Sequence, residues 1–510
     1  MRHGLRVDWR AGLSLVGAIL AFLSLAFVVP IIVALLDRGT DLWVFIVSMG
    51  ITAGTGLGLR RLDPDPTPGA REAFLVVALT WLAASIFGAL PYVLAGNGTI
   101  AQPVNALFES MSGFTTTGAT VMGDISFDTH SRAVLLWRQL TQWIGGMGII
   151  VLAVAILSQM SVGGAQLMEA ETPGPGVSKL SPHIAETARV LWLAYIGFTA
   201  LLIGLLYSLH VLGYAPNMTP YNTIAHGLST LPTGGFSTEA RSIEAFSPAV
   251  QWLIVPFMFI AGVNFVLWWH LLTGDPWTLL RDTEFRVYLS AVTGLSVLGT
   301  VVLFLSAVST PETGPVGGHL ERSARYATFQ MASLINSTGF ANMDFDAWNG
   351  PAKGLLLFAM LIGGSTGSTG GGIKVLRWLV ILKSLRREVF TTIHPQAVKP
   401  VRMNGKTLDE DAVRGIYAFT LLYFVLFFVG FAALSLDAAR VGFDIATLDL
   451  VSASLATLGN IGPGFGVVGP MEGYLDFPTS SKVLLILYMW IGRLEIFPVL
   501  VLLTAAYWRS

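Results

Sequence analysis

The chain contains no cysteine and few charged residues. None of its 510 residues is cysteine, 53% are hydrophobic, and only 12% are Asp, Glu, Lys or Arg. The absence of cysteine excludes disulfides, thiolate metal sites and cysteine nucleophiles. A soluble protein carries about 25% charged residues, whereas apolar runs long enough to cross a bilayer recur along this chain. The composition therefore predicts an all-α polytopic membrane protein surrounded by membrane lipid.

An excess of positive charge is also missing. The formal net charge is −1 at pH 7, so no basic field indicates nucleic acid, and we expect no nucleic-acid partner. No segment between the apolar runs is long enough to fold as a soluble domain. No glycine-rich phosphate motif lies on a strand–helix unit. The chain itself is therefore not expected to bind a nucleotide.

Ten apolar stretches are predicted to span the membrane. The first is too long for the apolar core of a cleaved signal peptide. The predicted spans are 12–36, 42–59, 73–95, 133–157, 188–212, 248–273, 287–308, 354–384, 412–435 and 482–507.

Basic residues predict the orientation of these spans. Three arginines precede the first span, two follow the second, and a basic loop runs from Arg386 to Arg414 after the eighth. Lys and Arg collect on the cytoplasmic side of membrane proteins. We therefore expect a multi-pass protein of the cytoplasmic membrane with both termini in the cytoplasm.

Four short stretches, each enclosed by a pair of spans, resemble one another. Each has a weakly polar helical run that ends in a small or hydroxyl residue, followed by Thr-Gly or, in the fourth, Leu-Gly. One such stretch alone would be an ordinary external turn, but four in the same position of four like units indicate an internal repeat. The predicted architecture is two N-terminal spans plus four span–pore helix–span repeats around one pore. The predicted units are 1–66 (two spans), 67–160, 161–275, 276–390 (with a broken second span) and 391–510.

This repeat suits the passage of a monovalent cation. A ring of backbone carbonyls replaces the hydration shell of the ion without a net charge that would trap it. Glycine accepts φ > 0, so we expect it to aim successive carbonyls at one axis, and the helix C-termini add partial negative charge. The predicted ion-binding filter comprises Thr116, Thr117 and Gly118; Pro232, Thr233 and Gly234; Ser337, Thr338 and Gly339; and Thr457, Leu458 and Gly459.

The eighth span is interrupted by Gly363–Gly372. Six glycines and four hydroxyl residues in this segment disfavour a helix, because each interior glycine costs about 1 kcal/mol relative to alanine. Arg493 lies in the otherwise apolar last span, where arginine is usually functional or paired. We expect it to face the pore, with a structural ion pair to Glu495 or another acid as the alternative. Lys374 is a weaker candidate, since it could extend towards the cytoplasm.

Two further polar residues fall in the predicted pore helices. We expect Glu109 to have a hydrogen-bonded structural role behind the filter and His226 to pack or hydrogen-bond rather than to bind a metal.

Together these segments resemble the Trk/Ktr/HKT superfamily of cation transporters, in its TrkH/TrkG branch. The resemblance covers nearly the whole chain and rests on the segments 108–120, 233–238, 336–340, 363–374 and 491–497. It implies potassium transport, a homodimer with one pore per protomer, and a separate cytosolic TrkA-like regulatory subunit that binds nucleotide. It implies no covalent cofactor, only K+ as the transported ion at the filter.

The resemblance also suggests roles for individual residues. A glycine in every filter segment is associated with potassium, and Gly118, Gly234, Gly339 and Gly459 meet this pattern, while Leu458 costs one hydroxyl but no carbonyl. A sodium or sodium/proton-coupled transporter is the alternative, and passive and coupled mechanisms both stay open. The broken span is implied to form an intramembrane gate, made of Gly367, Ser368, Thr369, Gly370, Gly371 and Gly372 with Lys374 and Arg493.

A membrane enzyme acting on lipid or isoprenoid substrates is the alternative from another class. It would need clustered acids or histidines inside the membrane for metal or general-base chemistry. The predicted spans offer almost none, so we expect no enzymatic activity.

Overall fold

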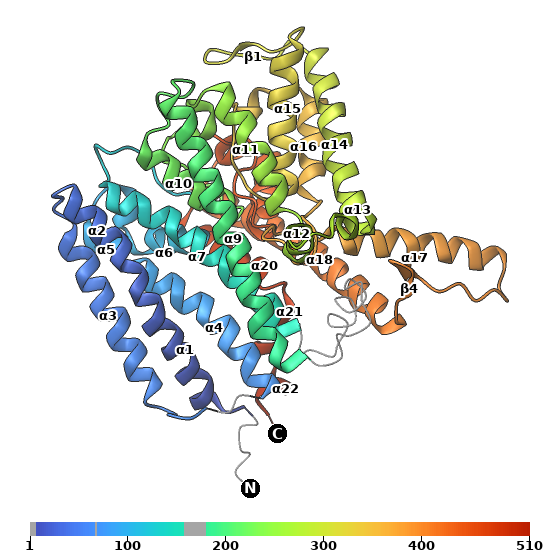
Figure 1. Ribbon diagram of the computed structural model, residues 1–510, viewed down its shortest axis with the longest axis horizontal. Helices are drawn as coiled ribbons and strands as arrows, with labels where there is room; N and C mark the ends of the chain where they lie inside the picture. Colours follow the sequence, from blue (N-terminus) through green and yellow to red (C-terminus); the bar gives the residue numbers. More distant parts are fainter. Residues whose placement is uncertain (1–6, 67–68, 158–179, 510) are drawn as a thin grey trace.

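The computed structural model describes residues 7–66, 69–157 and 180–509 (Figure 1). In these residues the only strands are two short hairpins, β1 (Ser309–Thr310) with β2 (Gly314–Pro315) and β3 (Arg402–Met403) with β4 (Lys406–Thr407). The predicted all-α architecture is confirmed. The unit boundaries predicted at 66/67 and 160/161 touch or fall within segments outside the described residues.

Two antiparallel spans open the chain and lie at one edge of the molecule (Figure 1). The first comprises α1 (Trp9–Leu23), the 3-10 turn η1 (Ser24–Phe27) and α2 (Val28–Leu36), and the second is α3 (Leu42–Arg60). A Cβ atom on Gly17 would lie only 2.6 Å from the Gly56 carbonyl oxygen. Small residues therefore let the two backbones meet, as is common between membrane helices.

Four units follow, each with two spans that enclose a short helix. The enclosed helices are α6 (Pro103–Phe114), α10 (Pro220–Thr230), α15 (Leu320–Ile335) and α19 (Thr447–Leu458). The spans are α4 (Ala70–Gly88) with α5 (Leu90–Ala95) and α7 (Arg132–Leu157) in unit 1; α9 (Leu180–Val211) and α11 (Pro248–Ala261) with α12 (Phe265–Leu272) in unit 2; α14 (Thr283–Phe304) and α16 (Gly350–Met360) with α17 (Val375–Ile393) in unit 3; and α18 (Glu410–Val441) and α20 (Thr479–Arg493) with α21 (Phe497–Leu502) and α22 (Ala505–Trp508) in unit 4. Short connecting elements are η2 (Thr99–Ala101), η3 (Ser242–Ala245), α13 (Pro276–Arg281), η4 (Phe345–Ala347) and η5 (Gly466–Val468).

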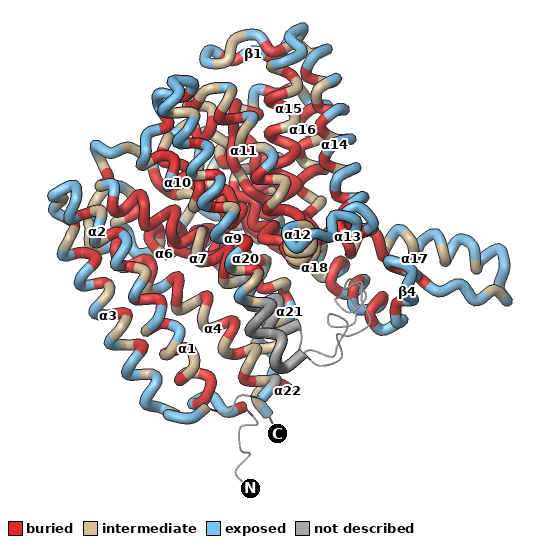
Figure 2. Tube along the Cα trace, viewed as in Figure 1, coloured by how far each residue is buried: buried red, intermediate tan, exposed pale blue. Residues whose placement is uncertain are grey.

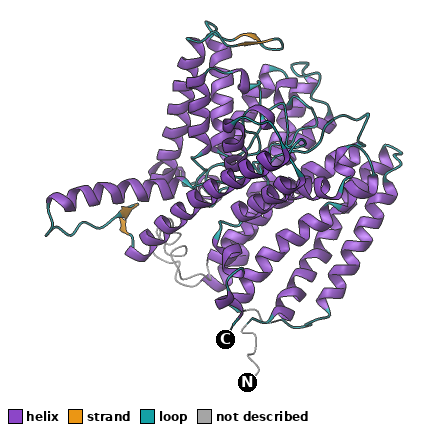
Figure 3. Cartoon of the chain, turned by 180° about the vertical axis from the view of Figure 1, so that it is seen from behind, coloured by secondary structure: helices purple, strands orange, loops and turns teal. Residues whose placement is uncertain are grey.

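The distribution of buried residues is that of a membrane protein with a polar centre. Six described helical runs are long and apolar enough to cross a membrane, namely Trp9–Leu36, Leu42–Arg60, Arg71–Ala95, Ala188–Val211, Thr283–Phe304 and Glu410–Val441. The outer helices expose large apolar side chains, such as Leu36 and Leu305 at 78% each. Buried segments gather at the centre (Figure 2), where the loops also converge (Figure 3). Lipid-facing helices thus surround a buried assembly of short helices and turns.

Two spans that the sequence predicted as continuous are interrupted. The predicted span 248–273 is wrong as one helix, because α11 and α12 are separated by a break and bent by 101°. The predicted span 482–507 is also broken, since Glu495 and Ile496 have left-handed backbones with φ of 55° and 67°. The predicted break in the eighth span is present: α16 ends at Met360 and α17 begins at Val375. Buried partners for the freed backbone groups make such breaks tolerable, and composition alone does not reveal those partners.

Candidate cation pathway

The four short helices end in the same backbone turn. Each is followed by one non-glycine residue in the left-handed conformation: Thr116 (φ 52°), Thr233 (56°), Ser337 (53°) and Asn460 (51°). The next amide donates to the carbonyl oxygen five residues earlier, from Thr117 to Ser112 (2.8 Å), Gly234 to Ser229 (2.9 Å), Thr338 to Ser333 (2.7 Å) and Ile461 to Ala456 (2.8 Å). This is a Schellman-type helix end. A left-handed residue other than glycine costs roughly 1–2 kcal/mol, so four of them in register indicate a geometry maintained by tertiary contacts.

A left-handed glycine follows two residues later in every unit. These glycines are Gly118 (φ 80°), Gly235 (80°), Gly339 (79°) and Gly462 (99°). Each lies against the backbone carbonyl that precedes the glycine of the next unit. A Cβ atom would stand 2.3 Å from Gly234 O on Gly118, 2.2 Å from Thr338 O on Gly235, 2.2 Å from Ile461 O on Gly339, and 2.6 Å from Thr117 O on Gly462. The contacts run from unit 1 to 2, 3, 4 and back to 1, so the four turns close a ring.

This geometry corrects the predicted register in two units. The expectation of φ > 0 at Gly234 and Gly459 is wrong: Gly234 is not left-handed, and Gly459 caps α19 with φ −81°. The left-handed glycine is one residue later in unit 2, at Gly235, and three residues later in unit 4, at Gly462. The predicted Pro232-Thr233-Gly234 is therefore one residue early, and Thr457-Leu458-Gly459 forms the last turn and cap of α19. In units 1 and 3 the left-handed glycines are the predicted Gly118 and Gly339.

Sequence alignment failed in these two units for different reasons. Unit 2 offers two consecutive glycines, and only the fold decides which one adopts φ > 0. In unit 4, Asn460-Ile461-Gly462 has the spacing of Ser337-Thr338-Gly339, and this match was a usable signal.

A buried ion pair within unit 1 lies behind the ring, and its arginine also bonds to unit 2. Glu109 in α6 and Arg138 in α7 are 2.6 Å apart, with side chains 0% and 2% exposed. Glu109 also accepts from the amide of Val121 (2.9 Å), and Arg138 donates to the Ser237 carbonyl (2.9 Å). The guanidinium lies 3.5 Å from the centre of the Phe236 ring. The structural role expected for Glu109 is confirmed. Arg138 was not predicted from the sequence, although an arginine inside an apolar stretch usually has a functional or structural role.

Two uncharged side chains complete this support. Gln142 donates from Nε2 to the Gly234 carbonyl (2.6 Å) and accepts from the Ser229 hydroxyl (2.6 Å). His226 is fully buried, with Nδ1 2.8 Å from the Asn222 carbonyl and Nε2 2.9 Å from the Ser237 hydroxyl. His226 is therefore a hydrogen-bonded packing residue, as expected.

The segment between α16 and α17, residues 361–374, is here called the central loop. It touches the C-terminal ends of three of the short helices. The amide of Gly371 donates to the Ser337 hydroxyl (2.5 Å), and the Thr369 hydroxyl donates to the Leu231 carbonyl (3.0 Å). A Cβ atom on Gly371 would lie 2.3 Å from the Gly459 carbonyl oxygen. The central loop thus packs directly against the turns of units 2, 3 and 4.

Two buried cationic side chains hold consecutive carbonyls of the central loop. Arg493, 4% exposed, donates to the Thr369 carbonyl (2.8 Å), and Lys374, 7% exposed, donates to the Gly370 carbonyl. Arg493 also reaches the Gly145 carbonyl of α7 (3.4 Å), so the loop is connected to unit 1. The predicted gate residues Gly367, Ser368, Thr369, Gly370, Gly371 and Gly372 all lie in this loop.

The alternative pairing of Arg493 with Glu495 is not found. Glu495 instead binds Arg377 at 2.6 Å, although it lines the same small pocket beside the central loop as Arg493. Lys374 bends back onto its own loop rather than extending away from it.

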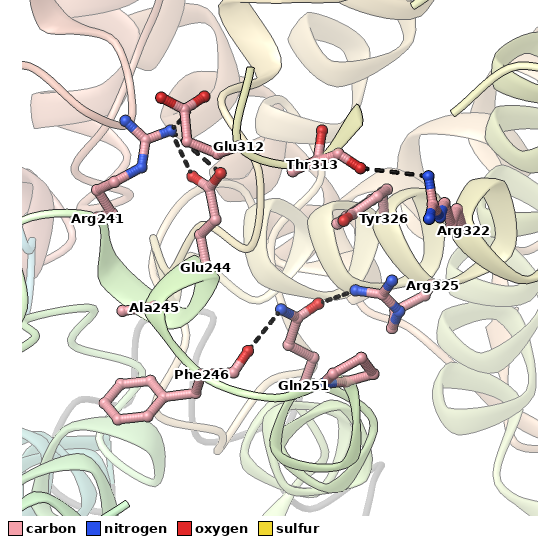
Figure 4. A pocket seen from close by; sticks show the side chains of 11 residues that line it. Arg241, Glu244, Ala245, Phe246, Gln251, Glu312, Thr313, Arg322, Arg325 and Tyr326 are labelled. Carbon is pink, nitrogen blue, oxygen red and sulfur yellow. Dashed lines mark hydrogen bonds and ion pairs between the residues drawn. The ribbon is translucent and has the colours of Figure 1, made fainter. Parts of the chain in front are cut away.

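A pocket of about 400 Å³ lies between units 2 and 3, away from all predicted site residues (Figure 4). Arg241 binds Glu244 at 2.9 Å and Glu312 at 3.4 Å, and Arg325 donates to the uncharged side chain of Gln251. These contacts join η3 to the hairpin β1–β2, which indicates a structural role.

Four units with equivalent turns, closed into one ring and enclosed by apolar helices, define an all-α multi-pass membrane protein. The chain belongs to the TrkH family, described as cation transport proteins, which matches residues 44–510. This family is one of transporters rather than enzymes.

Named relatives and a solved structure support this assignment. The chain is 38% identical over 508 residues to "Trk system potassium uptake protein TrkH" of Halomonas elongata, covering 98% of this chain and 99% of the relative. It is 35% identical to the protein of that name from Escherichia coli strain K12, covering 99% and 100%. The fold matches the crystal structure of the potassium transporter TrkH from Vibrio parahaemolyticus with a TM-score of 0.85 and 33% identity, covering 98% of this chain and 100% of that one. The predicted polytopic membrane fold is confirmed.

Proposed function

We propose that this protein carries potassium ions across the cytoplasmic membrane through the ring of four turns. The main support is that each left-handed glycine contacts a backbone carbonyl of the next unit, so that the contacts run through all four units and close a ring. Uncharged carbonyl oxygens suit a dehydrated monovalent cation, and the relatives described above are named for potassium uptake. The proposed ligands are the carbonyls that precede the glycines, those of Thr117, Gly234, Thr338 and Ile461.

The central loop is the proposed gate. It packs against three of the four turns, and Lys374 and Arg493 place positive charge beside it. Positive charge on the pathway opposes the entry of a cation, and in a region of low dielectric constant this repulsion is poorly screened. Movement of the loop away from the turns would open the pathway, displace Lys374 and break the bond that Arg493 makes to the loop.

A separate cytosolic subunit of the TrkA type, which binds nucleotide, is the proposed regulator, and the chain itself is proposed to form a homodimer. The basic loop from Arg386 to Arg414 is the proposed docking surface, and α17 carries part of it away from the helical body (Figure 1). Val7 and Tyr507 pack in one cluster with Leu75, which supports placing both ends of the chain on the same, cytoplasmic side.

The test is ion flux through the purified chain in lipid vesicles, measured separately with potassium, rubidium, sodium and lithium. We expect potassium and rubidium to pass faster than sodium and lithium. Faster sodium flux would support the sodium alternative and contradict a potassium filter, whereas potassium flux that depends on a sodium or proton gradient would show a coupled mechanism.

A further inference from the structure

Glu284 accepts hydrogen bonds from backbone amides on both sides of Gly367–Gly372. It lies in the first turn of α14 and is 3% exposed. One carboxylate oxygen, Oε1, accepts from the amide of Thr366 (2.7 Å) and from the amide of Leu376 (3.1 Å). Thr366 belongs to the loop, and Leu376 lies in the first turn of α17. A single oxygen therefore ties together the two ends of the segment that packs against the ring.

The start of α14 is in turn bonded to the hairpin β3–β4. Asp282 caps α14 by accepting from the amide of Phe285 (2.6 Å). Asn404, in the left-handed turn of the hairpin (φ 46°), donates to Asp282 Oδ2 (2.9 Å) and accepts from the amide of Thr283 (3.0 Å). The hairpin is thus attached by one side chain to the helix end that carries Glu284.

The hairpin has an exposed tip on a buried base. Arg402, Asn404 and Lys406 are exposed, whereas Val401 and Met403 are buried in the large core cluster. The tip lies within the basic loop proposed above as the docking surface. A protein bound there would contact Asn404 or its neighbours directly.

The far side of the central loop is held by the break in the sixth span. The amide of Ser365 donates to the Gly262 carbonyl (2.8 Å), and the amide of Phe265 donates to the Gly367 carbonyl (3.3 Å). The two breaks thus satisfy each other's backbone groups, which is required of irregular backbone at membrane depth. The loop is therefore held between a backbone anchor in unit 2 and a side-chain anchor at Glu284.

We propose that Glu284 is a positioning residue that seats the central loop against the ring, and that the hairpin β3–β4 transmits the docking of the cytosolic partner to it through Asn404 and Asp282. This inference rests on the proposed function of the loop. Without the negative charge, the two buried amides keep only a neutral acceptor, and a hydrogen bond to a neutral group stabilises less than one to a charged group. The loop then spends more time away from the ring.

The absence of cysteine allows a direct test in the full chain. Ser368, 6% exposed, lies in the loop, and Ser368→Cys in lipid vesicles is labelled with a small maleimide. We expect Glu284→Gln, which keeps the shape but removes the charge, to raise the labelling rate about tenfold, which corresponds to about 1.4 kcal/mol. Basal potassium flux should rise with it. Asn404→Gly keeps a left-handed turn but removes both side-chain bonds to α14, and we expect a rise of about threefold.

Asp275→Asn is the matched control, because Asp275 caps the neighbouring α13 through Thr278 and has no bond to the loop among the described residues. It should label at the parent rate. Unchanged labelling in both Glu284→Gln and Asn404→Gly would overturn the inference while leaving potassium transport intact. If Glu284→Gln does not fold, the exposed Asn404→Gly decides by itself. A parent chain without selective potassium flux would contradict the proposed function, whereas labelling would still report whether Glu284 holds the loop.

Discussion

The register of the ring in unit 4 is tested by comparing Gly462→Ala with Gly459→Ala. Gly462 has φ 99°, and its Cβ atom would stand 2.6 Å from the Thr117 carbonyl oxygen. Gly459 has φ −81°, which alanine adopts freely, and its nearest new contact is Leu455 O of the same helix end at 2.9 Å. The two substitutions add the same methyl group three residues apart, so they form a matched pair.

The expected cost at Gly462 has two parts. The left-handed backbone costs an alanine roughly 1–2 kcal/mol. In addition, the Thr117 carbonyl must move by about 0.8 Å to reach the 3.4 Å of an ordinary contact. A carbonyl displaced by this much no longer lies at the same distance from the ion as the three equivalent carbonyls. Because the preference for potassium depends on that ring of carbonyls, the variant should lose selectivity.

The assay is competitive flux of potassium and sodium through each variant in lipid vesicles. We expect Gly462→Ala to lower the potassium-to-sodium ratio at least tenfold, which is about 1.4 kcal/mol, and Gly459→Ala to change it less than twofold. Folding is checked by elution of the detergent-solubilised protein at the parent position. The opposite order, with selectivity lost in Gly459→Ala and kept in Gly462→Ala, would refute the ring derived from the structure.

Three further predictions concern the surroundings of the ring. Arg493→Ala removes a bond to the Thr369 carbonyl and a buried positive charge, so basal potassium flux should rise; loss of flux in folded protein would contradict the gate. Breaking the Glu109–Arg138 pair by Glu109→Gln or Arg138→Met should destabilise the protein by about 3–5 kcal/mol, measured by thermal unfolding in detergent. The unfolding temperature of the double variant should be no lower than that of either single variant. Burial, and then the positive charge of Arg138, lower the pKa of His130 in the loop before α7. Because the folded state then binds fewer protons than the unfolded state, the free energy of unfolding should fall as pH drops below about 6.5, the ordinary histidine pKa. His130→Gln should abolish this loss of stability.

Much of the fold follows from composition and spacing alone. The bilayer requires long apolar helices, so the spans are visible in the sequence, and a polar interruption such as Gly363–Gly372 is visible by contrast. The four-fold repetition is visible because every unit must build the same turn. In units 1 and 3 a single glycine follows two hydroxyl residues, and the predicted positive φ of these glycines, Gly118 and Gly339, is found in the structure.

The parts that could not be predicted depend on distant partners. The breaks after Ala261 and Arg493 follow long apolar runs, and the central loop supplies hydrogen-bond partners for backbone groups at the break after Ala261. The sequence does not distinguish Gly234 from Gly235, because their neighbours come from distant parts of the chain: Gln142 lies beside Gly234 and the Thr338 carbonyl beside Gly235. Glu284 gives no local signal, since its importance comes from two amides more than eighty residues away along the chain. The sequence by itself determined the membrane fold, the four units and the chemistry of the turns, because these follow from local composition and periodicity. Only the tertiary structure decided the register of the ring and the anchoring of the loop, because both are satisfied by groups that meet only after folding.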